Sequence, residues 1–253
     1  MNHPQLVSTL KQLRLSGLAT TLDVRLQEAA GNRLSHAEFL EVLLQDEMNL
    51  RQQHKIALRT RAAGFHGLKT LDSFDWHFNP EIPRKDIYQL ATGQFIREAT
   101  GAIFLGPSGT GKSHTALAIG YEAIKQGHTV LCRSIFDLVR DLMAEEALPQ
   151  KDHCLRHYLK PDLLIIEDFA GKQLPKHSGE YLLEVIMRRY ENRSVLVTSN
   201  RPLEDWGKLF QDVPVAGAIL DRLLHHSQLV IFAGRSYRLK DVPEFTTKIR
   251  PTE

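Results

Sequence analysis

The stretch that decides the fold is "AIFLGPSGTGKSHTALAIG", residues 102–120 of a 253-residue chain. Residues 106–113 match the pattern G-x-x-x-x-G-K-S/T without exception, with an apolar run before them and a helical pattern after them. The glycines let such a loop curl until its backbone N–H groups point at phosphate oxygens, and the following helix adds its positive N-terminal end. The stretch therefore predicts a triphosphate-binding loop between a strand and a helix.

The side chains of this loop predict the ligands. We expect Lys112 to reach the β- and γ-phosphates of a bound triphosphate and the Ser113 hydroxyl to bind Mg²⁺. The alternative, a glycine-rich turn with a chance lysine, is disfavoured because motif and context agree. The predicted nucleotide-binding residues are Gly106, Pro107, Ser108, Gly109, Thr110, Gly111, Lys112, Ser113 and His114.

Outward from the loop, short apolar runs alternate with helical patterns. Strands are predicted at "GAIFLG", "HTVLCRS", "DLLIIED" and "SVLVTSN", with "SQLVIF" and "SYRL" as late strands. Helices are predicted at about residues 85–92, 112–126, 135–147, 178–191 and 216–225. This alternation is typical of a mostly parallel sheet covered by helices on both faces, so the predicted fold class is α/β.

The first 70 residues carry a helical pattern instead, with leucines at positions 6, 10, 13, 18, 22 and 26. Ser35 and Glu38 fit a capping box that opens a helix from about His36 to Ala63. An irregular, aromatic-rich connector, "DSFDWHFNPEIPRKDIYQLA", follows from residue 72. We therefore expect a small all-α domain at 1–70 joined to an α/β domain at 71–253.

Polar residues follow two predicted strands. After "LLII", one of Glu167 and Asp168 can hold the Mg²⁺ shell while the other orients the attacking water, although a solvated acidic turn would look alike. Asn200 ends the next strand, where its amide can hydrogen-bond the γ-phosphate or the lytic water, unless it only makes a turn.

Arg222 stands in an otherwise apolar helix. It can reach a neighbouring subunit's γ-phosphate and stabilise transition-state charge, or it can form a surface pair with Asp221. The catalytic candidates are thus Lys112, Glu167, Asp168, Asn200 and Arg222. The pairs His153–His157, around Cys154, and His225–His226 are interpreted as structural rather than metal-binding.

A basic stretch without acidic residues runs from Glu47 to Asp72. Within it Arg51, Lys55 and Arg59 are spaced four apart, which places them on one helix face. With Arg61, this face is the predicted contact with the backbone of duplex DNA, largely independent of base sequence and sensitive to salt. A solvated helix face is the alternative. A second basic group, formed by Arg235, Arg238 and Lys240, has no assigned role.

The bulk composition limits the remaining classes. The net charge of +2 is too small to indicate nucleic acid by itself, and two scattered cysteines indicate a reducing compartment. We find no signal-peptide pattern and no apolar run long enough for a membrane span, so a cytoplasmic protein without membrane contacts is expected.

Several stretches together resemble the IstB family of transposon helper ATPases, relatives of the DnaC helicase loaders within the AAA+ superfamily. The resemblance covers about residues 5–240 and is carried by "GPSGTGKSH", "LLIIEDF", "VLVTSNRPLEDWGKLFQD", "AILDRLLHHSQLVIFAGRSYRL" and "SFDWHFNP". The ATP motifs are shared by all AAA+ initiators. The connector, "SNRPLEDWG" and "LDRLLHHS" are similar to IstB in particular.

The resemblance implies a role for each candidate. It places Lys112 and Ser113 in Walker A, Glu167 and Asp168 in Walker B, Asn200 at sensor I and Arg222 at the arginine finger. Most relatives have Asp first in Walker B, so which of the two acids activates water stays open. Only 31 residues follow Arg222, too few for a C-terminal helical lid of about 70–90 residues, so no lid domain is expected.

The function implied by the resemblance is ATP-dependent help in transposition, with residues 71–253 as the ATPase domain and residues 1–70 providing DNA, partner or oligomer contacts. The protein would assemble on duplex DNA as a ring or helical homo-oligomer, select or remodel target DNA, and recruit the partner transposase, with Mg²⁺-dependent hydrolysis of ATP. The alternative is a DnaC-like replicative helicase loader. A small-molecule kinase and a non-hydrolysing scaffold fit the acidic pair, Asn200 and Arg222 less well.

Overall fold

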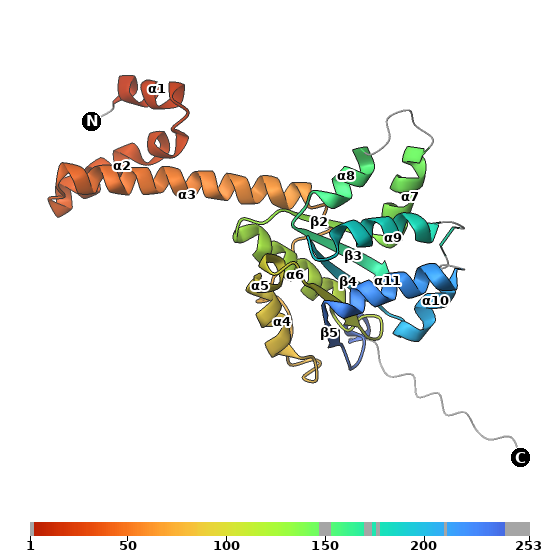
Figure 1. Cartoon of the computed structure of the whole chain (residues 1–253). Coiled ribbons are helices and arrows are strands. Elements are labelled where there is room, and N and C mark those ends of the chain that lie inside the picture. The colour runs from red at the N-terminus through yellow and green to blue at the C-terminus, as the bar shows by residue number, and fades with distance from the viewer. Residues whose placement is uncertain (1–2, 147–152, 170–173, 176–177, 210–211, 241–253) are drawn as a thin grey trace, which may run out of the picture. The chain divides into compact units, whose positions relative to one another are not determined.

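The computed structural model describes residues 3–146, 153–169, 174–175, 178–209 and 212–240. By contacts the chain forms two compact units, Met1–Arg61 and Ala62–Glu253 (Figure 1). Residues directly after the first unit belong to the second, since the Cys132 N–H donates to the Ala63 carbonyl at 2.8 Å. The functional division at residue 70 stays a prediction.

The first unit is all-helical, with α1 (Pro4–Gln12), α2 (Ser16–Asn32) and α3 (His36–Ala62). Its small core is formed by Leu10, Leu18, Leu22 and Leu43. The predicted capping box is confirmed: the Ser35 N–H donates to Glu38 Oε2 at 2.8 Å, and the Glu38 N–H donates to Ser35 Oγ at 3.3 Å.

A buried carboxylate ties α3 to the start of α2. Glu47, 5% exposed, accepts from the N–H groups of Gly17 at 2.6 Å and Leu18 at 3.3 Å. Gly17 permits this approach, because a Cβ there would lie 2.7 Å from the Glu47 Cα. The unpaired N–H groups at a helix start bind an anion well, so this contact stabilises the unit.

The second unit is built on a five-stranded sheet with the order β2-β3-β4-β1-β5. All four strand pairings are parallel. The strands are β1 (Gly101–Leu105), β2 (Val130–Ser134), β3 (Leu163–Phe169), β4 (Ser194–Ser199) and β5 (Ser227–Ile231). The carboxyl ends of all five strands therefore lie at one edge, where ligands bind in open α/β sheets.

Helices cover both faces of this sheet (Figure 1). α4 (Arg84–Ala91), α5 (Gln94–Arg97) and α6 (Lys112–Lys125) lie on one side, and α6 contacts β2, β3 and β4. The other elements are α7 (Ile135–Glu146), α8 (His153–Leu159), α9 (Ser178–Arg189), η1 (Leu203–Asp205), α10 (Trp206–Leu209), α11 (Val213–His225) and η2 (Tyr237–Leu239).

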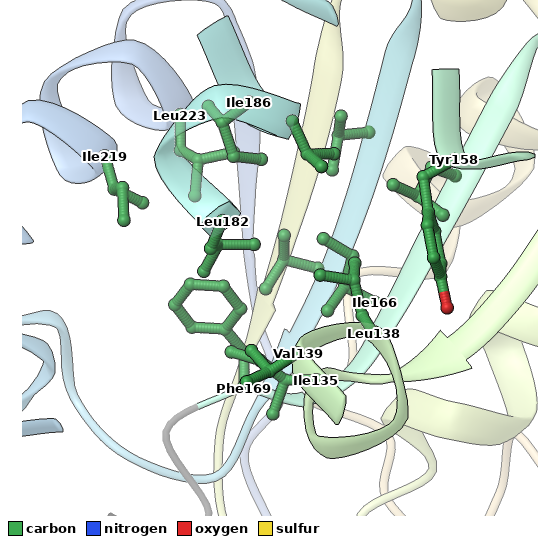
Figure 2. Packing of buried hydrophobic residues seen from close by; sticks show 14 of the residues in the cluster. Ile135, Leu138, Val139, Tyr158, Ile166, Phe169, Leu182, Ile186, Ile219 and Leu223 are labelled. Atoms are coloured by element: carbon green, nitrogen blue, oxygen red, sulfur yellow. The ribbon is translucent and has the colours of Figure 1, made fainter. Parts of the chain in front are cut away.

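Successive buried side chains of a strand pack against the helices on opposite faces of the sheet. Leu164 and Ile166 of β3 belong to the large core under α7, α9 and α11 (Figure 2). Ile165 points the opposite way, toward α6, where a Cβ on Gly120 would lie 2.8 Å from its Cδ1. A strand buried on both faces needs an apolar residue at every position, which explains the unbroken run "LLII".

The α/β fold class is confirmed, and the predicted strands and helices are found within a few residues, except one. Residue 147, the expected end of a helix, lies outside the described residues. The strand predicted at "SYRL" is wrong: Tyr237–Leu239 forms a 3₁₀ turn. The Tyr237 N–H donates to the Gly109 carbonyl at 2.9 Å, so this segment crosses the glycine-rich loop and is held there instead of joining the sheet.

None of the helices in the described part of the chain combines the length and apolar character that crossing a bilayer requires.

Candidate functional site

The glycine-rich loop connects β1 to α6 at the carboxyl edge of the sheet. Gly109 and Gly111 have φ values of 80° and 104°, a left-handed conformation that favours glycine. A Cβ at Gly111 would also lie 2.4 Å from the Phe74 ring. The sequence therefore produces this loop through glycines that both the backbone turn and the neighbouring aromatic ring require.

Lys112 lies inside the loop and is 8% exposed. Its Nζ donates to the carbonyls of Gly106 at 2.8 Å and Pro107 at 2.7 Å. Burial lowers the pKa of Lys112 to about 8, with the negative charge of Asp168 opposing and the positive charge of Arg238 adding to the effect. An anion beside the ammonium group would reverse this shift, so the loop is prepared for a negatively charged ligand.

A cavity of about 390 Å³ opens above the loop. Residues 108–114 form its floor, and Asp168 and Asn200 from the ends of β3 and β4 also line it. Because β3 and β4 are parallel neighbours, their polar termini lie at the same edge as the loop. The structure thus brings together four of the predicted catalytic and binding features: the loop, Lys112, Asp168 and Asn200.

Aromatic residues that the sequence analysis did not single out as site residues enclose the same cavity. Phe74 and Phe78 come from the connector, and Tyr237 comes from η2. The Phe74 ring packs edge-on against His114 at 5.2 Å between centroids, and His114 Nε2 lies 3.0 Å from the Thr70 carbonyl. Flat apolar rings beside a phosphate loop fit a purine base, and the aromatic content of "SFDWHF" was the available signal.

A second cavity, of about 450 Å³, adjoins the site and is lined by Ser113, Glu167 and Asp168 together with His66 and Arg133. Glu167 is buried, and its Oε2 accepts from Cys132 Sγ at 3.4 Å and lies 3.3 Å from His66 Nδ1. Burial and the nearby Glu167 carboxylate raise the pKa of the Cys132 thiol well above its usual range.

The two acids of β3 occupy different environments. Asp168 is exposed, has a φ of 55° and stands where the pairing register of β3 and β4 shifts. Such an irregularity re-aims a side chain. Asp168 lines both cavities, whereas Glu167 lines only the second one.

Arg222 is not brought to the loop of its own chain. It is half-buried on α11, donates from Nη1 to the Ala218 carbonyl at 3.0 Å, and lines a separate small cavity with Tyr190 and Glu191. Its predicted role in a neighbouring subunit's site stays a prediction.

Arg238 is an unexpected member of the candidate site, since the sequence analysis left it without a role. It lines both cavities from η2, close enough to Lys112 to affect that pKa. The neighbouring backbone is anchored by Asn79, whose Nδ2 donates to the Arg235 carbonyl at 2.9 Å and whose Oδ1 accepts from the Arg235 N–H at 3.0 Å. Sequence spacing alone could not indicate this contact between residues far apart in the chain.

The predicted DNA-binding residues lie on the second half of α3. Arg51 is paired within its unit: its Nε donates to Glu47 at 2.7 Å and its Nη2 to the Arg14 carbonyl at 3.1 Å. Lys55 and Arg61 are exposed, and Arg59 is partly exposed. The predicted contact with DNA stays a prediction for all four.

Comparison with known proteins identifies a family. A sequence model of the family described as IstB-like ATP binding protein matches residues 8–244. The ATP-binding protein of insertion sequence IS21 from Pseudomonas aeruginosa is 36% identical over 232 residues, 92% of this chain and 88% of that protein. The corresponding protein of IS5376 from Geobacillus stearothermophilus is 35% identical, over 91% of this chain and 92% of its own length.

Two solved structures share the fold. A structure of DnaI aligns with a TM-score of 0.53 at 20% identity, covering 66% of this chain and 89% of that one. AMPPCP-bound DnaA from Aquifex aeolicus aligns with a TM-score of 0.55 at 19% identity, covering 70% of this chain and 54% of that one. These likenesses concern the arrangement of the sheet and its helices.

Proposed function

The chain belongs to the family of IstB-like ATP-binding proteins of insertion sequences, and from this premise we propose that it is a Mg²⁺-dependent ATPase that assembles on duplex DNA to assist transposition. One observation carries the proposal: the phosphate loop, an acid of β3 and the amide after β4 converge on one cavity. That set can bind a triphosphate and direct water at its γ-phosphate.

The acids divide the chemistry in this proposal. Glu167 shares the second cavity with Ser113 and would support the Mg²⁺ ion from that side. Asp168 lines the second cavity too, but of the two acids it alone shares the first cavity with Asn200 and Lys112, so it would orient the attacking water. The ion itself would neutralise charge on the β- and γ-phosphates.

Assembly follows from the position of Arg222. Because its own chain keeps it away from the phosphate loop, Arg222 would complete the site of a neighbouring subunit and stabilise charge on the γ-phosphate there. A head-to-tail contact of this kind repeats into a ring or a helical filament. Exposed apolar side chains at steps of four along α3, Leu40, Leu44 and Met48, support further contacts between subunits or with a partner.

Duplex DNA is the proposed track for the assembly. Lys55, Arg59 and Arg61 present positive charge along about two turns of α3, and residues 48–71 contain no acid. This arrangement suits phosphate contacts that carry no base information. Relatives at 36% and 35% identity are named for insertion sequences, which supports a transposase as the partner over a replicative helicase.

The proposal is tested by electron microscopy of the protein with duplex DNA in three conditions: with ATP, with ADP and without nucleotide. We expect ordered oligomers on DNA only in the presence of ATP. In a separate assay, the protein should release phosphate from ATP without a small-molecule acceptor. Lys112→Ala should lose ATP binding and assembly together. An unchanged oligomer on DNA with this variant would contradict the coupling, and preferential capture of a replicative helicase over the transposase would favour a helicase loader.

A further inference from the structure

A second group of ligand-type side chains lies away from the nucleotide cavities, at the ends of α9 and α11. Glu191, His225 and His226 each offer one ligand atom, and these atoms all lie within 4.8 Å of one another. None of the three lines either cavity of the nucleotide site. The proposed ATPase function therefore leaves this group unexplained.

The backbone explains why two consecutive histidines converge. Successive residues of an α-helix point about 100° apart, so neighbouring side chains normally diverge. His225 is the last residue of α11, and His226 leaves the helix with φ −124° and ψ 23°. Their rings consequently approach edge to face, 4.1 Å between centroids.

The third side chain comes from the turn that follows α9, a helix that packs against α11. Glu191 has a φ of 55°, so the chain turns sharply after the helix. Its Oε1 lies 3.0 Å from His226 Nε2, and the Tyr190 hydroxyl lies 2.5 Å from His225 Nδ1. A ring nitrogen of each histidine therefore has an oxygen atom of the α9 end segment within hydrogen-bond distance.

The spacing is close to that of a coordination shell. Tetrahedral zinc with bonds of about 2.0–2.1 Å holds its ligand atoms about 3.4 Å apart. The ligand atoms lie within 4.8 Å here, so an ion would need to draw them together by at most about 1.4 Å. Glu191 and His225 are exposed and His226 is half-buried, so side-chain rotation can supply this movement.

We propose that Glu191, His225 and His226 bind one divalent transition-metal ion of the zinc class. Two imidazoles and a carboxylate favour such an ion over Mg²⁺, which prefers oxygen ligands and water. The Tyr190 hydroxyl or a water molecule would take the fourth position. Because Arg222 lies one helical turn before His225, the ion would also fix the end of the helix that carries Arg222.

Zinc titration of the metal-stripped full-length protein, without nucleotide or DNA, tests this site. A competing chromophoric chelator reports affinity and stoichiometry, and Co²⁺ as a spectroscopic substitute reports the ligands. We expect one equivalent of Zn²⁺ per chain and an increase in the melting temperature on zinc addition. Since loss of outer partners of zinc ligands weakens binding by about 10–100-fold, Glu191→Gln and the double variant H225A/H226A should weaken it at least about 10-fold.

The matched control is H153A/H157A, which removes two histidines from the same domain. It should bind zinc as the unchanged protein does. Without metal, each variant should have the same melting temperature as the metal-free unchanged protein. The absence of stoichiometric binding, or equal losses in the control and in H225A/H226A, would overturn the site. Undiminished binding by Glu191→Gln and H225A/H226A would do the same. The zinc titrations use no nucleotide, so their outcome does not depend on whether Lys112→Ala loses ATP binding. The metal site and the proposed ATPase function can therefore be disproved independently.

Discussion

At the scale of single residues, the buried ammonium of Lys112 should make ATP binding sensitive to pH. Its pKa is about 8 in the ligand-free protein, and phosphate oxygens would raise it on binding. We therefore expect ATP to bind the protonated form, so its affinity should fall as pH rises through 8, by at most about tenfold per pH unit. Isothermal titration between pH 7 and 9.5 measures this fall.

Lys112→Arg is the control for this prediction, because a guanidinium stays charged over that pH range. The ATP affinity of the Lys112→Arg variant, whatever its absolute value, should depend little on pH above 8. A flat profile for the unchanged protein would contradict the link to Lys112, as would an equal decline in the arginine variant.

Neutral substitutions of Glu167 and Asp168, the two acids of β3, should have different effects on ATP hydrolysis. Glu167→Gln should raise the Mg²⁺ concentration needed for half-maximal hydrolysis, because Glu167 lines the second cavity with Ser113 and does not line the first one with Asn200. Asp168→Asn should leave that concentration unchanged and lower kcat, by about 10²-fold or more if it positions the lytic water. Magnesium titrations of steady-state phosphate release distinguish the two effects, and reversed results would exchange the assigned roles.

At the scale of elements, the second half of α3 should set the salt dependence of DNA binding. Replacing Lys55, Arg59 and Arg61 by Ala should reduce the slope of log Kobs against log salt by about 0.9 for each DNA phosphate that the protein no longer neutralises. ATP affinity should be unchanged. Arg51 is left intact, because its pairing with Glu47 is part of the first unit's own structure. Fluorescence anisotropy with duplex DNA at several salt concentrations measures the slope.

The control for this experiment is a triple variant in the second unit, in which Lys85, Lys125 and Arg188 are changed to Ala. These residues are exposed, and both triple variants lose three positive charges, so the net charge changes equally. If both sets reduced the slope to the same extent, net charge and not the α3 face would account for the binding.

The start of α3 depends on its capping box. Ser35→Ala removes the hydroxyl that accepts the Glu38 N–H and should cost about 1 kcal/mol in unfolding free energy. Urea denaturation followed by far-UV circular dichroism measures the loss. Ser8→Ala, an exposed substitution inside α1, should be close to neutral, so similar losses in both variants would contradict a specific capping effect.

At the scale of the whole molecule, hydrolysis should require two different subunits. Asp168→Asn lacks the proposed water-orienting acid but keeps Arg222, and Arg222→Ala lacks the finger but keeps the acids. Each variant alone should be nearly inactive. An equal mixture should regain activity, because about one quarter of the interfaces in a random head-to-tail assembly join an intact site to an intact Arg222. Phosphate release by the mixture on duplex DNA provides the measurement.

Recovery in this mixture cannot come from either chain acting alone. The absence of any recovery, with both variants shown to enter the same oligomers, would place Arg222 outside the neighbour's site. The position of Arg222 on α11, away from the cavities of its own chain, is the structural reason for expecting recovery.

Much of this molecule follows from local sequence. The glycine spacing around Lys112 predicted the loop, and the apolar run 163–166 predicted a doubly buried strand, because both patterns depend on neighbours along the chain. The prediction of a strand at "SYRL" was wrong, because the local sequence pattern does not reveal the hydrogen bond from the Tyr237 N–H to the distant Gly109 carbonyl. Phe74, Phe78 and Arg238 were missed as site residues for the same reason.

The sequence by itself determined the α/β fold, the phosphate loop and the family, because each rests on residue types at fixed spacing. The tertiary structure alone decided which residues surround the nucleotide cavity and which acid faces Asn200. It also brought Glu191, which follows α9, close to His225 and His226 at the end of α11. These features depend on contacts between distant segments, and such contacts form only when the sheet aligns its strand ends and the helices pack against it.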